Sequence, residues 1–167
     1  KGMGDALEIG TFVQNIVGSS ASASILLPAI LFVVAIFLAF STGTSWGTFA
    51  ILVPIAIAMF PGADKLEMMI ISVSAVLAGA VCGDHVSPIS DTTVMSSAGA
   101  QSNHINHVTT QMQYAAVVAV VCFIGYIIAG VSQSWWIALG SSLVILLVVL
   151  TVMKRLFASR EKKRVAA

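Results

Sequence analysis

The sequence predicts an all-α integral membrane protein whose transmembrane helices include a re-entrant hairpin and a discontinuous helix. Hydrophobic residues make up 58% of the chain and charged residues only 9%, whereas a soluble domain is about 25% charged. The apolar residues form long runs, and several approach the roughly 20 residues that a helix needs to cross a bilayer. Polar residues and helix breakers interrupt two of these runs. In a membrane such interruptions are tolerated around a cavity, so they predict helices broken at a binding site.

The first apolar region covers residues 25–60, and we expect the preceding segment, 1–24, to be an interfacial helix or the end of a preceding span. The sequence STGTSWGT at 41–48 divides this region, and each half contains a proline, Pro28 or Pro54. Each half is shorter than a full span. We therefore expect a re-entrant hairpin, and a single crossing by a broken helix is the alternative.

Three further apolar segments complete a predicted transmembrane domain of residues 25–153. Residues 68–100 are expected to form a discontinuous helix, because polar residues and a proline interrupt them, whereas 112–131 and 135–153 are continuous spans. The tail at 154–167 carries the basic residues Lys154, Arg155, Arg160, Lys162, Lys163 and Arg164. The positive-inside rule places this basic tail in the cytoplasm.

The sequence GDHVSPISDTT at 83–93 is the strongest candidate for a functional site, because it contains two carboxylates between apolar segments. Charged groups are costly at membrane depth and normally face a cavity on the path of an ion, a proton or a substrate. Pro88 disfavours a continuous helix, so we expect Asp84 and Asp91 to flank an unwound segment that binds a hard cation such as Na⁺. Burial also favours a protonated carboxyl, so the same group could carry a proton. Alternatively, Ser90 or Asp91 caps the following helix.

The interruption at 41–48 offers neutral oxygen ligands. Its hydroxyl groups lie beside two glycines, which permit tight backbone bends. The hydroxyl residues are Thr42, Thr44, Ser45 and Thr48. An ordinary polar turn at the membrane surface is the alternative, but the long apolar flanks favour a site within the membrane.

Three histidines add titratable groups. His85 lies beside the first acid and is a candidate proton relay, and a structural histidine is an equally good interpretation. His104 and His107 have the i, i+3 spacing of some zinc ligands, but no third ligand follows, so pH sensing or a plain cytoplasmic loop is favoured. Cys82 and Cys122 both lie in apolar runs and are expected to be buried free thiols.

The two interruptions carry a resemblance to a known family. The sequences STGTSWGTFAILVPIA at 41–56 and GDHVSPISDTTVMSSAGAQSNHINHVTTQMQYA at 83–115 resemble signature stretches of the NhaC family of Na⁺/H⁺ antiporters. That family belongs to a superfamily of ion transporters with inverted repeats, and this chain resembles its C-terminal repeat. The resemblance implies exchange of cytoplasmic Na⁺ for external H⁺ by alternating access, with no enzymatic activity and no cofactor beyond the transported ions.

The resemblance also implies an ion site. Asp91 is the expected central acid and Asp84 the second titrating acid. The full set of expected ion-site residues is Asp91, Asp84, Ser90, Thr92, Thr93, Thr44 and Ser45, with Na⁺ on Asp91, Ser90 and Thr44.

The expected partners follow from the same resemblance. They are membrane lipid, Na⁺ or Li⁺ and the N-terminal half of the same transporter, with a homodimer left open and no nucleic acid. The expected location is the plasma membrane of a prokaryote, an inner membrane, which the protein crosses several times. Exchange there would serve pH homeostasis.

Three other functions remain as alternatives. A Na⁺- or H⁺-coupled transporter of a small organic anion such as malate or lactate could use the hydroxyls and a helix N-terminus, but the apolar segments lack Arg and Lys to pair with the anion. An intramembrane aspartyl protease needs a GxGD motif, whereas residues 81–84 read VCGD. A non-catalytic membrane scaffold subunit would tolerate apolar replacement of both interruptions.

Overall fold

The computed structural model describes residues 21–60, 62 and 65–165, with side chains described for 25–60, 62 and 65–155. These residues form helices and contain no strand, which confirms the predicted all-α class. The helices are α3 (Ala21–Thr42), α4 (Ser45–Ala58), α5 (Leu66–Val86), α6 (Asp91–Gly99), α7 (His104–Ser132) and α8 (Trp135–Val165). The segment predicted at 1–24 lies outside the described residues, apart from positions 21–24, which begin α3.

Within the described part of the chain, four helices are long and apolar enough to cross a membrane, which confirms the predicted membrane-protein class. Their candidate spans are Ile25–Thr42, Leu66–Val86, His104–Ser132 and Trp135–Arg155. α4 has only 14 residues and is about 21 Å long, which is shorter than the roughly 30 Å hydrocarbon core of a bilayer. α8 continues beyond the predicted end of its span and includes the basic segment as far as Val165.

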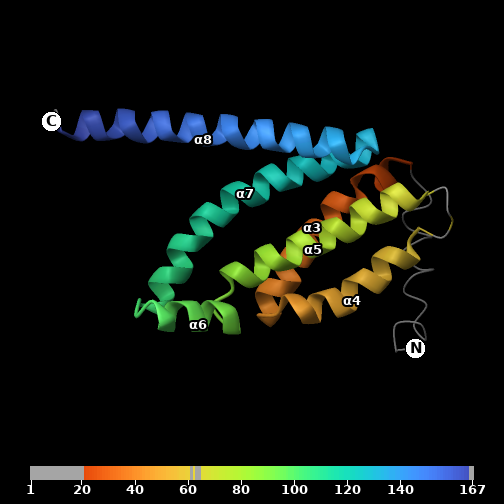
Figure 1. Ribbon diagram of the computed structural model, residues 1–167, viewed down its shortest axis with the longest axis horizontal. Helices are drawn as coiled ribbons and strands as arrows, with labels where there is room; N and C mark the ends of the chain where they lie inside the picture. Colours follow the sequence, from red (N-terminus) through yellow and green to blue (C-terminus); the bar gives the residue numbers. More distant parts are fainter. Residues whose placement is uncertain (1–20, 61, 63–64, 166–167) are drawn as a thin grey trace.

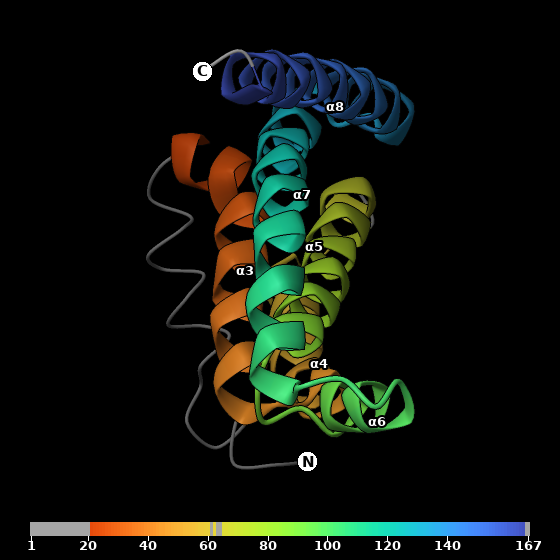
Figure 2. The same ribbon diagram turned by 90° about the vertical axis from the view of Figure 1, so that its left-hand side faces the viewer.

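α3 and α5 form the centre of the bundle. They run side by side in the same direction, and α7 returns along them in the opposite direction (Figures 1 and 2). α4 folds back from the end of α3 and packs on α5, whereas α8 lies across the other end of the bundle against α7 (Figure 1). The α3–α4 pair is thus a helical hairpin in shape, and its predicted re-entrant position in a bilayer stays a prediction.

Small residues let α5 approach α3 closely. Gly79 faces the carbonyl oxygen of Phe32 and Gly83 faces that of Ile36, so closely that an added Cβ would overlap each oxygen. Such small residues allow the backbones of membrane helices to pack in direct contact. The contact holds the last turn of α5, which contains Asp84, against the last turns of α3.

The hydrophobic core lies between α3, α4 and α5. Small fully buried residues line it where the helices cross: Ala35, Ala39, Ala56, Ala75 and Ala80. The core also contains the larger side chains of Met59, Phe60 and Met68. This packing fixes the N-terminal end of α4 beside the C-terminal end of α5, where the polar residues gather.

Candidate functional site

The two interruptions found in the sequence lie against each other at one end of the bundle. The first is the turn between α3 and α4 at Gly43, and the second is the segment 87–90 between α5 and α6. A Cβ added at Gly43 would lie 2.9 Å from the carbonyl oxygen of Ile89. The hydroxyl of Ser87 donates a hydrogen bond of 2.8 Å to the carbonyl oxygen of Phe40, near the end of α3. Polar residues distant in the sequence therefore share one region.

The first turn depends on glycine and on a helix cap. Gly43 has φ +67°, a conformation that glycine adopts readily and other residues do not. Thr44 is then the N-cap of α4, and its hydroxyl accepts a hydrogen bond of 3.3 Å from the backbone N–H of Gly47. The cap satisfies a backbone donor that the first turn of the helix leaves free. Ser45, the first residue of α4, is thereby directed toward α5.

The second interruption depends on proline. Pro88 removes a backbone donor and disfavours a helical conformation in the residue before it. Accordingly Ser87 is extended, with φ −74° and ψ 128°, and α5 ends at Val86. The helix resumes at Asp91, so the unwound segment is shorter than the polar sequence 83–93.

Asp84 is the buried acid of the site. It lies in the last turn of α5 and is 7% exposed. Its Oδ2 accepts a hydrogen bond of 3.1 Å from the hydroxyl of Ser45, at the positively polarised N-terminus of α4. Its Oδ1 is buried and has no hydrogen-bond partner in the described part of the chain. A buried polar atom without a partner is rare and costly, so Oδ1 is available to a further ligand or a proton.

Asp91 has a different environment. Its side chain is exposed at the start of α6, and its Oδ1 accepts a hydrogen bond of 2.8 Å from the backbone N–H of Thr92. Ser90 is the N-cap residue and is buried, and its hydroxyl contacts that of Thr92 at 2.8 Å. Thr93 is buried and donates to the carbonyl oxygen of His85 at 3.3 Å. Asp91 thus contacts the start of its own helix. Between the two interruptions, the predicted site residues that form a hydrogen bond are Ser45 and Asp84.

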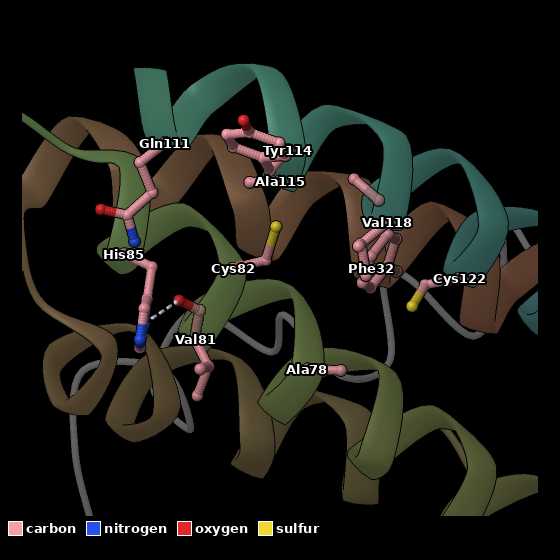
Figure 3. A pocket seen from close by; sticks show the side chains of 11 residues that line it. Phe32, Ala78, Val81, Cys82, His85, Gln111, Tyr114, Ala115, Val118 and Cys122 are labelled. Carbon is pink, nitrogen blue, oxygen red and sulfur yellow. Dashed lines mark hydrogen bonds between the residues drawn. The ribbon is translucent and has the colours of Figure 1, made fainter. Parts of the chain in front are cut away.

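His85 faces a different side of α5 from Asp84. It lines a cavity of about 380 Å³ between α3, α5 and α7, and Figure 3 shows it with Gln111 at one end of this cavity and Cys122 at the other. Its Nδ1 lies 3.1 Å from the carbonyl oxygen of Val81. Adjacent residues on a helix point about 100° apart, which explains why neighbours in the sequence differ here. The proton-relay role of His85 stays a prediction.

The other two histidines lie near the start of α7. His104 contacts both the carbonyl oxygen of Pro88, at 2.7 Å from Nε2, and the hydroxyl of Ser97, at 3.0 Å from Nδ1. His107 is half-buried one turn later. No group of three or more metal-ligating side chains occurs among the described residues. pH sensing by either histidine stays a prediction.

A family model decides what kind of protein this is. The model of the Na⁺/H⁺ antiporter family matches residues 2–131, a range that includes both interruptions, Ser45 and Asp84. The chain belongs to the Na⁺/H⁺ antiporter family. The two contacting interruptions are therefore features of an antiporter-family chain.

The antiporter-family chain is also similar to one curated protein from Haemophilus influenzae, which is described as uncharacterized. The two are 48% identical over 149 residues, which is 89% of this chain and 28% of the relative. The chain thus spans just over a quarter of the length of the relative that it matches. No solved structure gives a significant match to the chain.

Two features of the antiporter-family site were not found from the sequence. Ser87 is fully buried, and its hydrogen bond to Phe40 connects the second interruption to α3. Gly83 provides the close contact between α5 and α3. A weak signal was present for both, since Gly83 and Ser87 directly flank the three residues 84–86, which include the candidate acid and the end of α5.

Replacing Gly43 by alanine is expected to destabilise the protein. The substitution would put a side chain into a left-handed backbone conformation, which costs about 1–2 kcal/mol. It would also place a Cβ 2.9 Å from Ile89, and overpacking typically adds about 1–3 kcal/mol. Thermal unfolding in detergent should show a melting temperature several degrees below that of Gly99→Ala, whose added Cβ has no neighbour within 4 Å. Equal melting temperatures would mean that the two interruptions do not pack together as described.

Proposed function

We propose that the protein is a secondary active transporter of the NhaC type that exchanges Na⁺ for H⁺ across a membrane. The observation that carries the proposal is Asp84, a carboxylate that is 7% exposed, with one oxygen bonded to Ser45 and the other without a partner in the described residues. Membership of the Na⁺/H⁺ antiporter family supports the same activity. The chain covers 28% of its curated relative, so the activity is proposed for the protein as its complete gene encodes it.

The chemistry of the site suits a hard cation. Na⁺ is bound in transporters by carboxylate, hydroxyl and unwound carbonyl oxygens. Asp84 offers its unpartnered Oδ1, and the Ser45 hydroxyl is within 3.1 Å of the same carboxylate. An isolated ionised carboxylate is too costly to keep in an apolar environment. We therefore assign Asp84 two alternative loaded forms, one with Na⁺ and one with a proton.

Competition between these two loaded forms would couple the fluxes. Since one carboxylate holds either Na⁺ or a proton, each ion leaves when the other binds. Exchange then requires that the loaded protein changes which side of the membrane the site opens to. This change is a shift between two conformations with different ion affinities. The hinge that we propose for this change is the contact between Gly43 and Ile89, where both broken helices meet.

The remaining predicted residues are assigned supporting roles. Asp91 is exposed at the start of α6, so we place it at the entrance of the site, where it attracts the cation. Ser90 and Thr92 hold the start of α6 through their mutual hydrogen bond of 2.8 Å. Thr44 positions Ser45 through the cap of α4. Assembly with further parts of the same transporter, location in a prokaryotic plasma membrane and a cytoplasmic C-terminus belong to this proposal.

Proteoliposomes with a pH-sensitive dye inside would test the proposal. The protein is expressed from its complete gene, the vesicles are acidified inside, and Na⁺, Li⁺ or K⁺ is added outside. We expect Na⁺ to raise the internal pH. The half-saturating Na⁺ concentration should increase as the pH falls, approaching about tenfold per pH unit for one proton competing with one Na⁺.

The other outcomes separate the alternatives. A response to malate or lactate together with Na⁺, and none to Na⁺ alone, would support an organic-anion transporter. No response to any of these solutes from folded, correctly inserted protein would favour a scaffold subunit.

A further inference from the structure

His104 connects the start of α7 to the unwound segment of the site. Its Nε2 lies 2.7 Å from the carbonyl oxygen of Pro88, a residue 16 positions earlier in the chain. Its Nδ1 lies 3.0 Å from the hydroxyl of Ser97 on α6. The imidazole thus joins α7, α6 and the interruption between α5 and α6, whereas the sequence predicted pH sensing or a plain cytoplasmic loop at this position.

The hydrogen bond to Pro88 requires a proton on Nε2 of the imidazole. A carbonyl oxygen can only accept, so Nε2 must carry a proton and donate it. Nδ1 then pairs with Ser97, whose hydroxyl is also within 2.9 Å of the carbonyl oxygen of Val94. Both the neutral Nε2–H tautomer and the imidazolium keep the bond to Pro88. The link between α7 and the interruption therefore does not depend on the charge of His104.

Pro88 lies between the two acids of the site in the sequence. Two contacts hold this segment to the α3–α4 side: Ser87 donates to Phe40 at 2.8 Å, and Ile89 packs on Gly43. The bond from His104 to Pro88 holds the segment from the α7 side. Because these contacts hold the segment from both sides, they fix the direction of the chain from Asp84 to Asp91.

We propose that His104 is a positioning residue of the cation site, which acts through the Pro88 carbonyl and sets the geometry between Asp84 and Asp91. This inference rests on the proposed cation exchange and adds a residue outside the site to it. When the bond is lost, the unwound segment is free to rotate on its remaining anchors. The site then binds Na⁺ more weakly, while the helices and their packing are retained.

The test compares four variants in the proteoliposome assay, with Na⁺ as the probe. His104→Gln keeps a donor near the position of Nε2, whereas His104→Asn can replace Nδ1 but is too short to reach Pro88. His104→Ala removes both contacts. His107→Ala is the matched control, because it removes an imidazole from the same helix. The His107 side chain makes no hydrogen bond to other described residues.

We expect His104→Ala and His104→Asn to raise the half-saturating Na⁺ concentration about tenfold, an effect of the size expected for the loss of one hydrogen bond. His104→Gln should restore it to near the wild-type value, and His107→Ala should leave it unchanged. His104→Gln and His104→Asn each keep one of the two contacts, so their melting temperatures in detergent should be close to one another. If His104→Ala does not fold, the comparison of His104→Gln with His104→Asn gives the same answer.

Two results would overturn the inference. If both His104→Ala and His104→Asn keep the wild-type half-saturating Na⁺ concentration, the bond to Pro88 does not position the site. If these variants lower the melting temperature without changing that concentration, the bond contributes only to the stability of the fold. These results would leave Na⁺/H⁺ exchange itself intact. A wild-type protein that does not respond to Na⁺ would instead overturn the proposed function, and this inference with it.

Discussion

Asp84→Asn is expected to abolish Na⁺-dependent proton movement in proteoliposomes. Asparagine has nearly the volume of aspartate, and its carbonyl oxygen can still accept the hydrogen bond that the Ser45 hydroxyl donates over 3.1 Å. It cannot carry a negative charge or be protonated, so both proposed loaded forms are lost. We expect exchange to fall at least about 100-fold, which corresponds to about 2.7 kcal/mol of lost ion binding. The melting temperature should change little, because the variant keeps the packing around position 84.

Asp91→Asn is the informative comparison for this prediction. Because Asp91 is exposed and bonds to the start of α6, we expect this variant to need a higher Na⁺ concentration but to retain exchange at saturation. Ser45→Ala should lie between the two, since it removes one neutral oxygen from a site that keeps its carboxylate. The opposite order, with exchange lost in Asp91→Asn and kept in Asp84→Asn, would return the central role to Asp91 and contradict our assignment.

The sequence was sufficient to predict where the helices are broken. Pro88 and the glycine–threonine pair at 43–44 act within one or two residues of themselves, through a missing donor, a restricted preceding residue and a positive φ. The helix class could be predicted for the same reason, because long apolar segments have few alternatives in a membrane. The segment 1–24, most of which lies outside the described residues, stays a prediction.

The sequence could not show which acid is buried. Asp84 faces α4 because the contact of Gly79 and Gly83 with α3 fixes the rotation of α5 about its own axis. A rotation of one residue position, about 100°, would direct His85 toward α4 instead. The sequence contains no periodic polar pattern on α5 that would select one rotation, since apolar residues occur on every face of a helix buried in a membrane.

Hydrogen bonds between residues far apart in the chain also could not be predicted from sequence patterns. His104 meets Pro88 because α6 is short and the chain turns back at 100–103. The length of α6 and the geometry of that turn decide the contact, and neither follows from the spacing of histidines. Similarly, Ser87 is one of several hydroxyls in the sequence, and its selection depends on the position of Phe40 at the end of another helix.

Gly83→Ala is expected to cause a large loss of stability. A Cβ at this position would overlap the carbonyl oxygen of Ile36 and lie 3.0 Å from the backbone nitrogen of Phe40. Both neighbours belong to the α3 backbone, so no side-chain rotation can relieve the overlap, and the helices must separate. We expect destabilisation at or above the usual 1–3 kcal/mol of overpacking.

The same substitution should impair ion binding, because position 83 directly precedes Asp84 and α5 would move away from α3. Gly140→Ala is the matched control: it lies in the second turn of α8, and an added Cβ there has no neighbour within 4 Å. It should stabilise the protein slightly, by roughly 0.5–1 kcal/mol, since alanine is the better helix former. Melting temperature and Na⁺ titration are measured on both variants. If Gly83→Ala matched Gly140→Ala in both measurements, α3 and α5 would not be in backbone contact, and the burial of Asp84 that depends on this contact would have to be abandoned.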